Sequence, residues 1–194
     1  MGMSPPSDRP ALLLITLALV CWVALLALLL LGGMDSVAPL DPQRLLFYGL
    51  ALVAPILTFV PIERATGLLG LTVEGSVGLA LLLTMLAIVP APRVGLPALS
   101  ELPIYGLMLL ALFLSVSALA RPLIYQANLR FWPVRALPTN SRRVRRQSYA
   151  VGLLPVAIAT LAALRVFTWI SLLLVLVILL LTELLFSIWA PTEA

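Results

Sequence analysis

The sequence predicts an all-α, polytopic integral membrane protein with six transmembrane helices and both termini in the cytoplasm. Three observations predict this class: the scarcity of charge, the high hydropathy, and the regular spacing of the few charges. Only 10% of the 194 residues are charged, 62% are hydrophobic, and the mean hydropathy is +1.16. A soluble domain carries about 25% charged residues. A chain with so few charges could not cover a water-facing surface, so it belongs in a membrane.

Charged residues mark the ends of the predicted helices, because charge is costly inside a bilayer. The sequence contains six charge-free runs of 17 to 25 residues, and no other charge-free run exceeds 9. About 20 helical residues cross the hydrocarbon core, so each long run fits one crossing. The chain is expected to form a single transmembrane domain. Its spans are predicted at about 11–32, 44–62, 68–91, 103–124, 148–165 and 168–190, with a basic cytoplasmic loop at about 122–147.

Local signals support the ends of individual elements. The first apolar run is too long for a signal peptide and has no A-x-A site after it, so we expect a retained helix. Asp41 followed by Pro42 is typical of a helix start, with a capping carboxylate and a proline at the first helical position. Ser148 is a candidate cap for the fifth span. Pro55 and Pro155 lie inside spans two and five, where each is expected to kink its helix.

The distribution of arginine predicts the orientation. Six crossings put both termini and the second and fourth loops on one side. That side holds nine arginines and the other holds three, so the positive-inside rule makes the termini cytoplasmic. The basic residues are all arginine, a composition associated with GC-rich bacteria. We therefore expect a bacterial cytoplasmic (inner) membrane.

A dense arginine cluster lies in the predicted cytoplasmic loop and its approach. Setting the orientation of the chain in the membrane is enough to explain this cluster. Each basic residue near anionic lipid also contributes about 1 kcal/mol to the free energy of binding to the membrane surface. Part of 122–138 is expected to lie on the membrane surface. Because anionic lipid lies beside the cluster, we expect membrane lipid or an acidic partner there and no nucleic acid. The candidate contact residues are Arg130, Arg135, Arg142, Arg143, Arg145 and Arg146.

Two carboxylates fall within predicted spans and need a partner. Glu183 lies about two turns from the cytoplasmic end of the last span. Glu74 is about two turns inside if its span begins near Leu68, and interfacial if it begins at Gly75. Arg121, at the cytoplasmic end of span four, is the expected partner for either carboxylate. A structural ion pair is favoured over a proton- or cation-linked site, since no further acid or His supports the latter.

Small residues at helical spacing predict faces on which helices approach each other closely. One such face carries Glu74 and three glycines, and span five carries a second stripe. These candidate packing residues are Gly67, Gly70, Gly78, Gly152, Ala159 and Ala163. The last span is nearly all Leu, Val and Ile, so it is expected to face lipid or a partner helix.

The residue types present restrict the chemistry. The chain has no histidine and a single cysteine, Cys21, so no cofactor or metal is expected through His or a Cys cluster. Lipid or pigment are the ligands that such helices could hold. No catalytic motif is found, and convergent polar groups are too few for catalysis. We expect that the chain is not an enzyme.

These observations lead to three functional hypotheses. The first is a non-catalytic, accessory membrane subunit that packs in a larger membrane complex, as a scaffold or as a holder of lipid or pigment. The first alternative is a small transporter, or a transporter component, that uses Glu74, Glu183 and Arg121. The second alternative is a lipid-modifying membrane enzyme, which is suggested by the arginine-rich loop alone.

Overall fold

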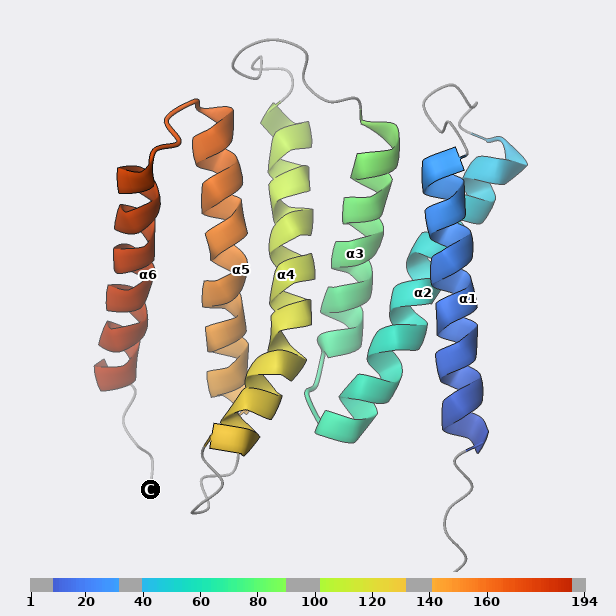
Figure 1. Cartoon of the computed structure of the whole chain (residues 1–194), viewed down its shortest axis with the longest axis horizontal. Coiled ribbons are helices and arrows are strands. Elements are labelled where there is room, and N and C mark those ends of the chain that lie inside the picture. Colours follow the sequence, from blue (N-terminus) through green and yellow to red (C-terminus); the bar gives the residue numbers. More distant parts are fainter. Residues whose placement is uncertain (1–8, 32–39, 90–101, 132–140, 190–194) are drawn as a thin grey trace, which may run out of the picture. The chain divides into compact units, whose positions relative to one another are not determined.

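The computed structural model describes residues 9–31, 40–89, 102–131 and 141–189, and within them every regular element is a helix (Figure 1). The all-helical prediction is therefore confirmed for this part of the chain. The chain divides into two compact units, Met1–Pro90 and Ala91–Ala194. The helices are α1 (Arg9–Leu31), α2 (Pro42–Thr66), α3 (Leu71–Ile88), α4 (Leu102–Phe131), α5 (Ser141–Ala163) and α6 (Trp169–Trp189).

Four of these helices, α1 to α4, are long and apolar enough to cross a membrane. They indicate a membrane-embedded protein, as the composition predicts. The first turns of α5 carry four arginines, which leaves only 147–163 free of charge. The apolar part of α6, Trp169–Leu185, is slightly shorter than a full crossing. The predicted count of six crossings therefore stays a prediction.

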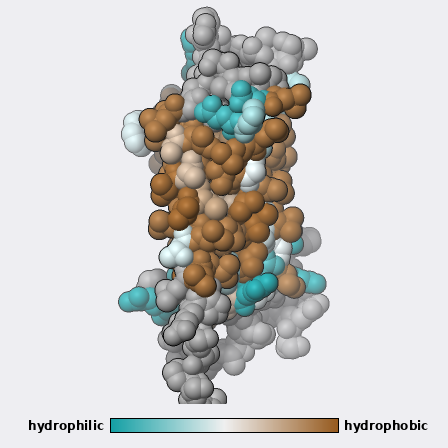
Figure 2. All heavy atoms as spheres, turned by 90° about the vertical axis from the view of Figure 1, so that its right-hand side faces the viewer, coloured by the Kyte–Doolittle hydropathy of each residue, from teal (hydrophilic) through white to brown (hydrophobic). Residues whose placement is uncertain are grey.

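The first unit is an antiparallel arrangement in which α2 packs against both α1 and α3 (Figure 1). All three helices meet in one core, formed by Leu25 of α1, Phe47 and Ala51 of α2, and Leu83 and Ala87 of α3. Figure 2 shows the face on the α1 and α2 side, where an apolar band lies between polar residues at both ends. This pattern fits a surface that is exposed to the hydrocarbon of a bilayer.

The start of α2 follows the sequence prediction. The backbone N–H of Gln43 donates a hydrogen bond of 2.9 Å to the Asp41 carboxylate, and Pro42 is the first helical residue. One of the backbone donors that a helix start leaves unpaired is therefore satisfied.

The turn between α2 and α3 differs from the prediction, which began the third span at residue 68. Gly67 ends α2 with φ of 69° and Gly70 precedes α3 with φ of 82°. Both values lie in the left-handed region that glycine adopts without a steric penalty. These two glycines therefore form a tight turn and do not lie on a helical packing face.

The second unit contains α4, α5 and α6, which run antiparallel to their neighbours in the chain, with α5 packed against both others (Figure 1). Helix α4 changes direction over its C-terminal turns (Figure 1), and Pro122 lies within that part. Proline removes a backbone hydrogen bond and clashes with the preceding turn, which accounts for the bend. Helix α6 packs against α5 less extensively than α4 does.

The predicted basic loop is largely helical where the structure describes it. Instead of a loop over about 122–147, α4 continues to Phe131 and α5 begins at Ser141. Arginine is a good helix former, and a helix need not end where it leaves the hydrocarbon. The four arginines at 142–146 therefore belong to the first turns of α5 rather than to a flexible connection.

Candidate functional site

Polar side chains gather in the second unit where α4 passes the start of α5. Arg121 of α4 is 2% exposed, yet it reaches two residues of α5. Its Nε donates to the hydroxyl of Ser148 at 3.3 Å, and its Nη2 donates to the hydroxyl of Tyr149 at 3.1 Å. Buried arginine is costly unless its donors are satisfied, so these contacts fix α5 against α4.

A second arginine converges on the same tyrosine. The Nε of Arg145, one turn before Tyr149 in α5, donates to the tyrosine hydroxyl at 2.7 Å. The guanidinium carbons of Arg121 and Arg145 lie 5.2 and 5.4 Å from the centre of the Tyr149 ring, within the range of cation–π attraction. We call Arg121, Arg145, Ser148 and Tyr149 the arginine–tyrosine cluster.

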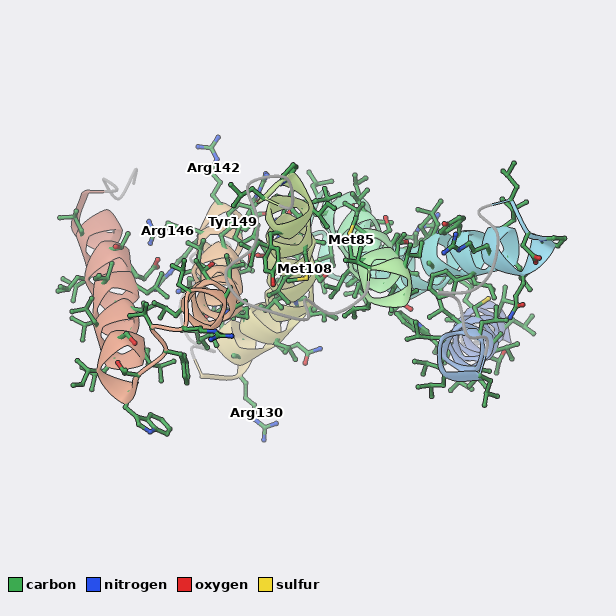
Figure 3. The ribbon with its side chains drawn as sticks, turned by 90° about the horizontal axis from the view of Figure 1, so that it is seen from above. Met85, Met108, Arg130, Arg142, Arg146 and Tyr149 are labelled. Atoms are coloured by element: carbon green, nitrogen blue, oxygen red, sulfur yellow. The ribbon has the colours of Figure 1, made fainter. Side chains whose placement is uncertain are left out.

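Glu183 of α6 pairs with Arg146 of α5, not with Arg121. The Nη2 of Arg146 lies 3.0 Å from Oε1 of Glu183, and the two side chains are 31% and 29% exposed. The prediction that Arg121 is the partner of Glu183 is therefore wrong. Because α5 lies between α4 and α6 (Figure 3), the carboxylate on α6 meets an arginine of α5, while Arg121 faces α5 from the α4 side.

Glu74 lies in the first turn of α3 and is partly exposed. The helix begins at Leu71, so Glu74 is only three residues from its start. A carboxylate in this position is favoured by the helix dipole. Glu74 belongs to the first unit, whereas Glu183 and Arg121 belong to the second. Neither unit therefore contains the predicted constellation of two carboxylates and one arginine.

A third carboxylate, which the sequence analysis missed, has a defined role. Glu63 of α2 accepts hydrogen bonds from the backbone N–H groups of Gly70 at 3.0 Å and Thr72 at 2.6 Å. It therefore caps α3 from the preceding helix and satisfies donors that the helix start leaves unpaired. The available signal was an acidic residue one turn before two closely spaced glycines.

The small residues divide into turn, packing and half-buried positions. A β-carbon on Gly152 of α5 would collide with Oγ of Ser117 and lie 3.0 Å from the backbone oxygen of Phe113, both in α4. Gly78 is buried in α3, while Ala159 and Ala163 are half-buried in α5.

Gly75, which was not among the predicted packing residues, lies against the ring of Phe59. A β-carbon at Gly75 would approach Cδ2 of that ring to 2.6 Å. This glycine is therefore a close-approach position between α2 and α3, although it lies outside the predicted spacing.

The arginines of the predicted contact set do not form one continuous patch. Arg142, Arg143 and Arg145 are exposed on α5, and Arg130 is exposed near the end of α4. Figure 3 shows Arg130 and Arg142 pointing to opposite sides of the unit. Arg135 lies outside the described residues.

The described residues also form a shallow, open groove of about 410 Å³ between α1 and α2. Its lining is almost entirely apolar, so an acyl chain fits it better than a polar ligand. The lining residues are Ala24, Ala27, Leu28, Leu31, Gln43, Leu46 and Leu50. Within the described ranges no three His, Cys, Asp or Glu side chains are grouped as a metal site would need.

The residue types of the arginine–tyrosine cluster restrict its chemistry. Guanidinium groups only donate hydrogen bonds and stay charged, and the hydroxyls offer no strong base.

In comparisons with protein-family models, curated proteins and solved structures, nothing matched the chain.

Proposed function

We propose that this chain is a non-catalytic integral membrane subunit that packs within a larger membrane complex. The observation that carries the proposal is the surface of α6. Its described side chains from Trp169 to Leu185 are exposed or half-exposed on all sides, and α5 is the helix of its own unit that it packs against. In a membrane this surface of Leu, Val and Ile contacts either lipid or a helix of another chain, and the proposal assigns it to the second.

The polar side chains support a structural role over a transport role. Glu183 is engaged by Arg146 and Glu63 caps α3, so these carboxylates join helices within each unit. A transport pathway needs ionisable groups that face a common cavity. Glu74 lies in the first turn of α3, at the end of that helix, and Glu183 is paired with an arginine, which favours the accessory-subunit function.

The proposal includes six crossings with cytoplasmic termini in a bacterial inner membrane. Charge-free residues 147–163 of α5 and the apolar length of α6 support two crossings beyond α1 to α4. With α4 ending on the cytoplasmic side, α5 and α6 would form a final hairpin, and the arginines of α5 would obey the positive-inside rule.

The test of the subunit function is purification of the tagged chain in a mild detergent, followed by mass spectrometry of the proteins that elute with it. We expect a stoichiometric complex. Elution of the wild-type chain alone, as a monomer or homodimer, would contradict the proposal.

A pair of matched variants tests whether α6 is the contact surface. Leu173→Trp with Leu180→Trp adds bulk to one exposed face of α6, and Leu19→Trp with Leu26→Trp does the same on α1. All four positions are exposed, so the fold itself has room for the larger side chains. The α6 variant is expected to lose the partners, whereas the α1 variant keeps them. Retention of the partners by both would contradict a role for α6.

A further inference from the structure

We propose that the arginine–tyrosine cluster binds the phosphate group of an anionic membrane lipid. Arg145 would contact the phosphate. Tyr149 would hold the side chain of Arg145 in place, and Arg121 would strengthen the local positive potential. This inference is independent of the proposed assembly, because it concerns a small-molecule site within one unit of the isolated chain.

The depth of the cluster along α4 matches the level of lipid phosphates. Helix α4 begins at Leu102, and at 1.5 Å per residue Arg121 lies about 30 Å further along the axis, which is the thickness of the hydrocarbon core. Tyrosine is also enriched at this level of a membrane. The cluster therefore lies where a bilayer presents its phosphate groups.

The geometry of the cluster favours an anion. The hydroxyl of Tyr149 accepts from Arg121 at 3.1 Å and from Arg145 at 2.7 Å, which keeps the two donor nitrogens within about 6 Å of each other, where like charges repel. An anion bound to the exposed guanidinium of Arg145 also interacts favourably with the nearby charge of Arg121. Arg121 is nearly inaccessible, and a buried charge is screened less than an exposed one, so its field adds to that of Arg145.

Arg145 combines exposure with a fixed orientation. Its side chain is accessible at the surface, while its Nε is bonded to the tyrosine hydroxyl and its guanidinium group lies over the ring. The ring of Phe113 packs against Tyr149 with a centroid distance of 5.4 Å and holds the tyrosine in place. A planar guanidinium that is held in this way suits the bidentate recognition of a phosphate.

The surroundings favour a lipid over a soluble phosphate ester. Arg145, Tyr149 and Leu153 follow one another at intervals of four residues, so they lie on one stripe of α5. Leu153 is 45% exposed, and it provides apolar surface for an acyl chain one turn from the cluster, toward the middle of the helix. An anionic phospholipid satisfies the charge and the apolar surface together, whereas inorganic phosphate satisfies the charge alone.

The remaining arginines provide controls with the same charge. Arg146 is paired with Glu183, and Arg142 points away from the unit (Figure 3). Diffuse attraction to an anionic surface depends on the number of charges. Binding at a specific site depends on the planar guanidinium group of Arg145 and on the Tyr149 hydroxyl that orients it. Charge-conserving substitutions therefore separate the two.

The experiment measures which lipids the purified full-length chain retains from vesicles. The vesicles contain equal parts of phosphatidylglycerol and phosphatidylcholine with the same acyl chains. We expect the wild type to enrich phosphatidylglycerol. Arg145→Lys and Tyr149→Phe should each lower this enrichment about threefold or more. Arg142→Lys and Tyr125→Phe should leave it unchanged. Thermal unfolding of each variant verifies that it is folded.

Three results would overturn the proposal. One is the absence of enrichment by the wild-type chain. The second is an equal response of the Arg145 and Arg142 variants, which would indicate diffuse electrostatics. The third is displacement of the retained phosphatidylglycerol by millimolar inorganic phosphate, with no displacement by chloride at the same ionic strength, which would assign the site to a soluble anion.

Discussion

A β-carbon at Gly75 has no room beside the ring of Phe59, and this contact decides how closely α3 approaches α2. In a membrane, where both helices are surrounded by hydrocarbon, close packing is a principal source of association energy. Single residues of this kind therefore contribute more to the association of the helices than their general apolar character does.

Gly75→Ala should destabilise the first unit by about 1–3 kcal/mol, because the added methyl group forces the ring or the backbone to move. Thermal unfolding in one detergent measures the change. Gly49→Ala in α2 is the matched control, since nothing lies within 4 Å of the added methyl group. The control should be neutral or stabilising by about 0.5–1 kcal/mol.

Removal of the clashing ring should rescue the first variant. In a Phe59→Leu background, Gly75→Ala is expected to lower the free energy of unfolding by less than it does in the wild type. The effects of substitutions at residues in contact are not additive. Equal costs in both backgrounds would show that the ring does not determine the spacing of these helices.

At the scale of elements, α6 is the helix that depends most on a single polar contact. Its apolar surface is largely exposed, and the ion pair between Arg146 and Glu183 joins it to α5. Both side chains are about one-third exposed, so the pair is worth at most about 1 kcal/mol. That small energy still matters, because α6 packs on its own chain less extensively than the other helices do.

Glu183→Gln or Arg146→Gln should increase hydrogen exchange in α6 and leave α4 unchanged. The double variant should add little to either single change, as expected for a coupled pair. Arg143→Gln, which removes the same charge from an exposed position of α5, is the control and should not affect α6. A transport activity that is lost in Glu183→Gln while α6 exchange stays normal would instead favour a transport role.

The elements that the sequence predicts well are those set by local chemistry. Asp41 and Pro42 start α2 as expected, because a cap involves neighbours in the chain. The partner of Glu183 was not predictable, because successive residues of a helix point about 100° apart and only the packing of α5 decides whether Arg145 or Arg146 faces α6. The role of Glu63 was missed because the capping donors belong to the next helix.

At the scale of the whole molecule, the number of crossings decides where the loop between α5 and α6 lies. Six crossings place Arg165 outside the cytoplasm, whereas four crossings by α1 to α4 would leave it on the same side as Arg142. The two topologies therefore make opposite predictions for one accessible position.

Single cysteines introduced in a Cys21→Ala background test whether the chain crosses the membrane four or six times. With Arg165→Cys, we expect labelling of intact cells by a membrane-impermeant maleimide, and with Arg142→Cys labelling only after permeabilisation. Both positions lie outside the charge-free runs that form the predicted spans. A need for permeabilisation at both positions would contradict six crossings.

The contact between Glu63 and the start of α3 has a consequence for synthesis. The bonded groups are only seven and nine residues apart in the chain. The ribosome has therefore delivered both sides of the contact almost as soon as α2 is complete. The carboxylate needs neither α1 nor the second unit to find its donors. In the proposed topology this corner stays on the cytoplasmic side, and its carboxylate can be bonded to the backbone before the rest of α3 has been made.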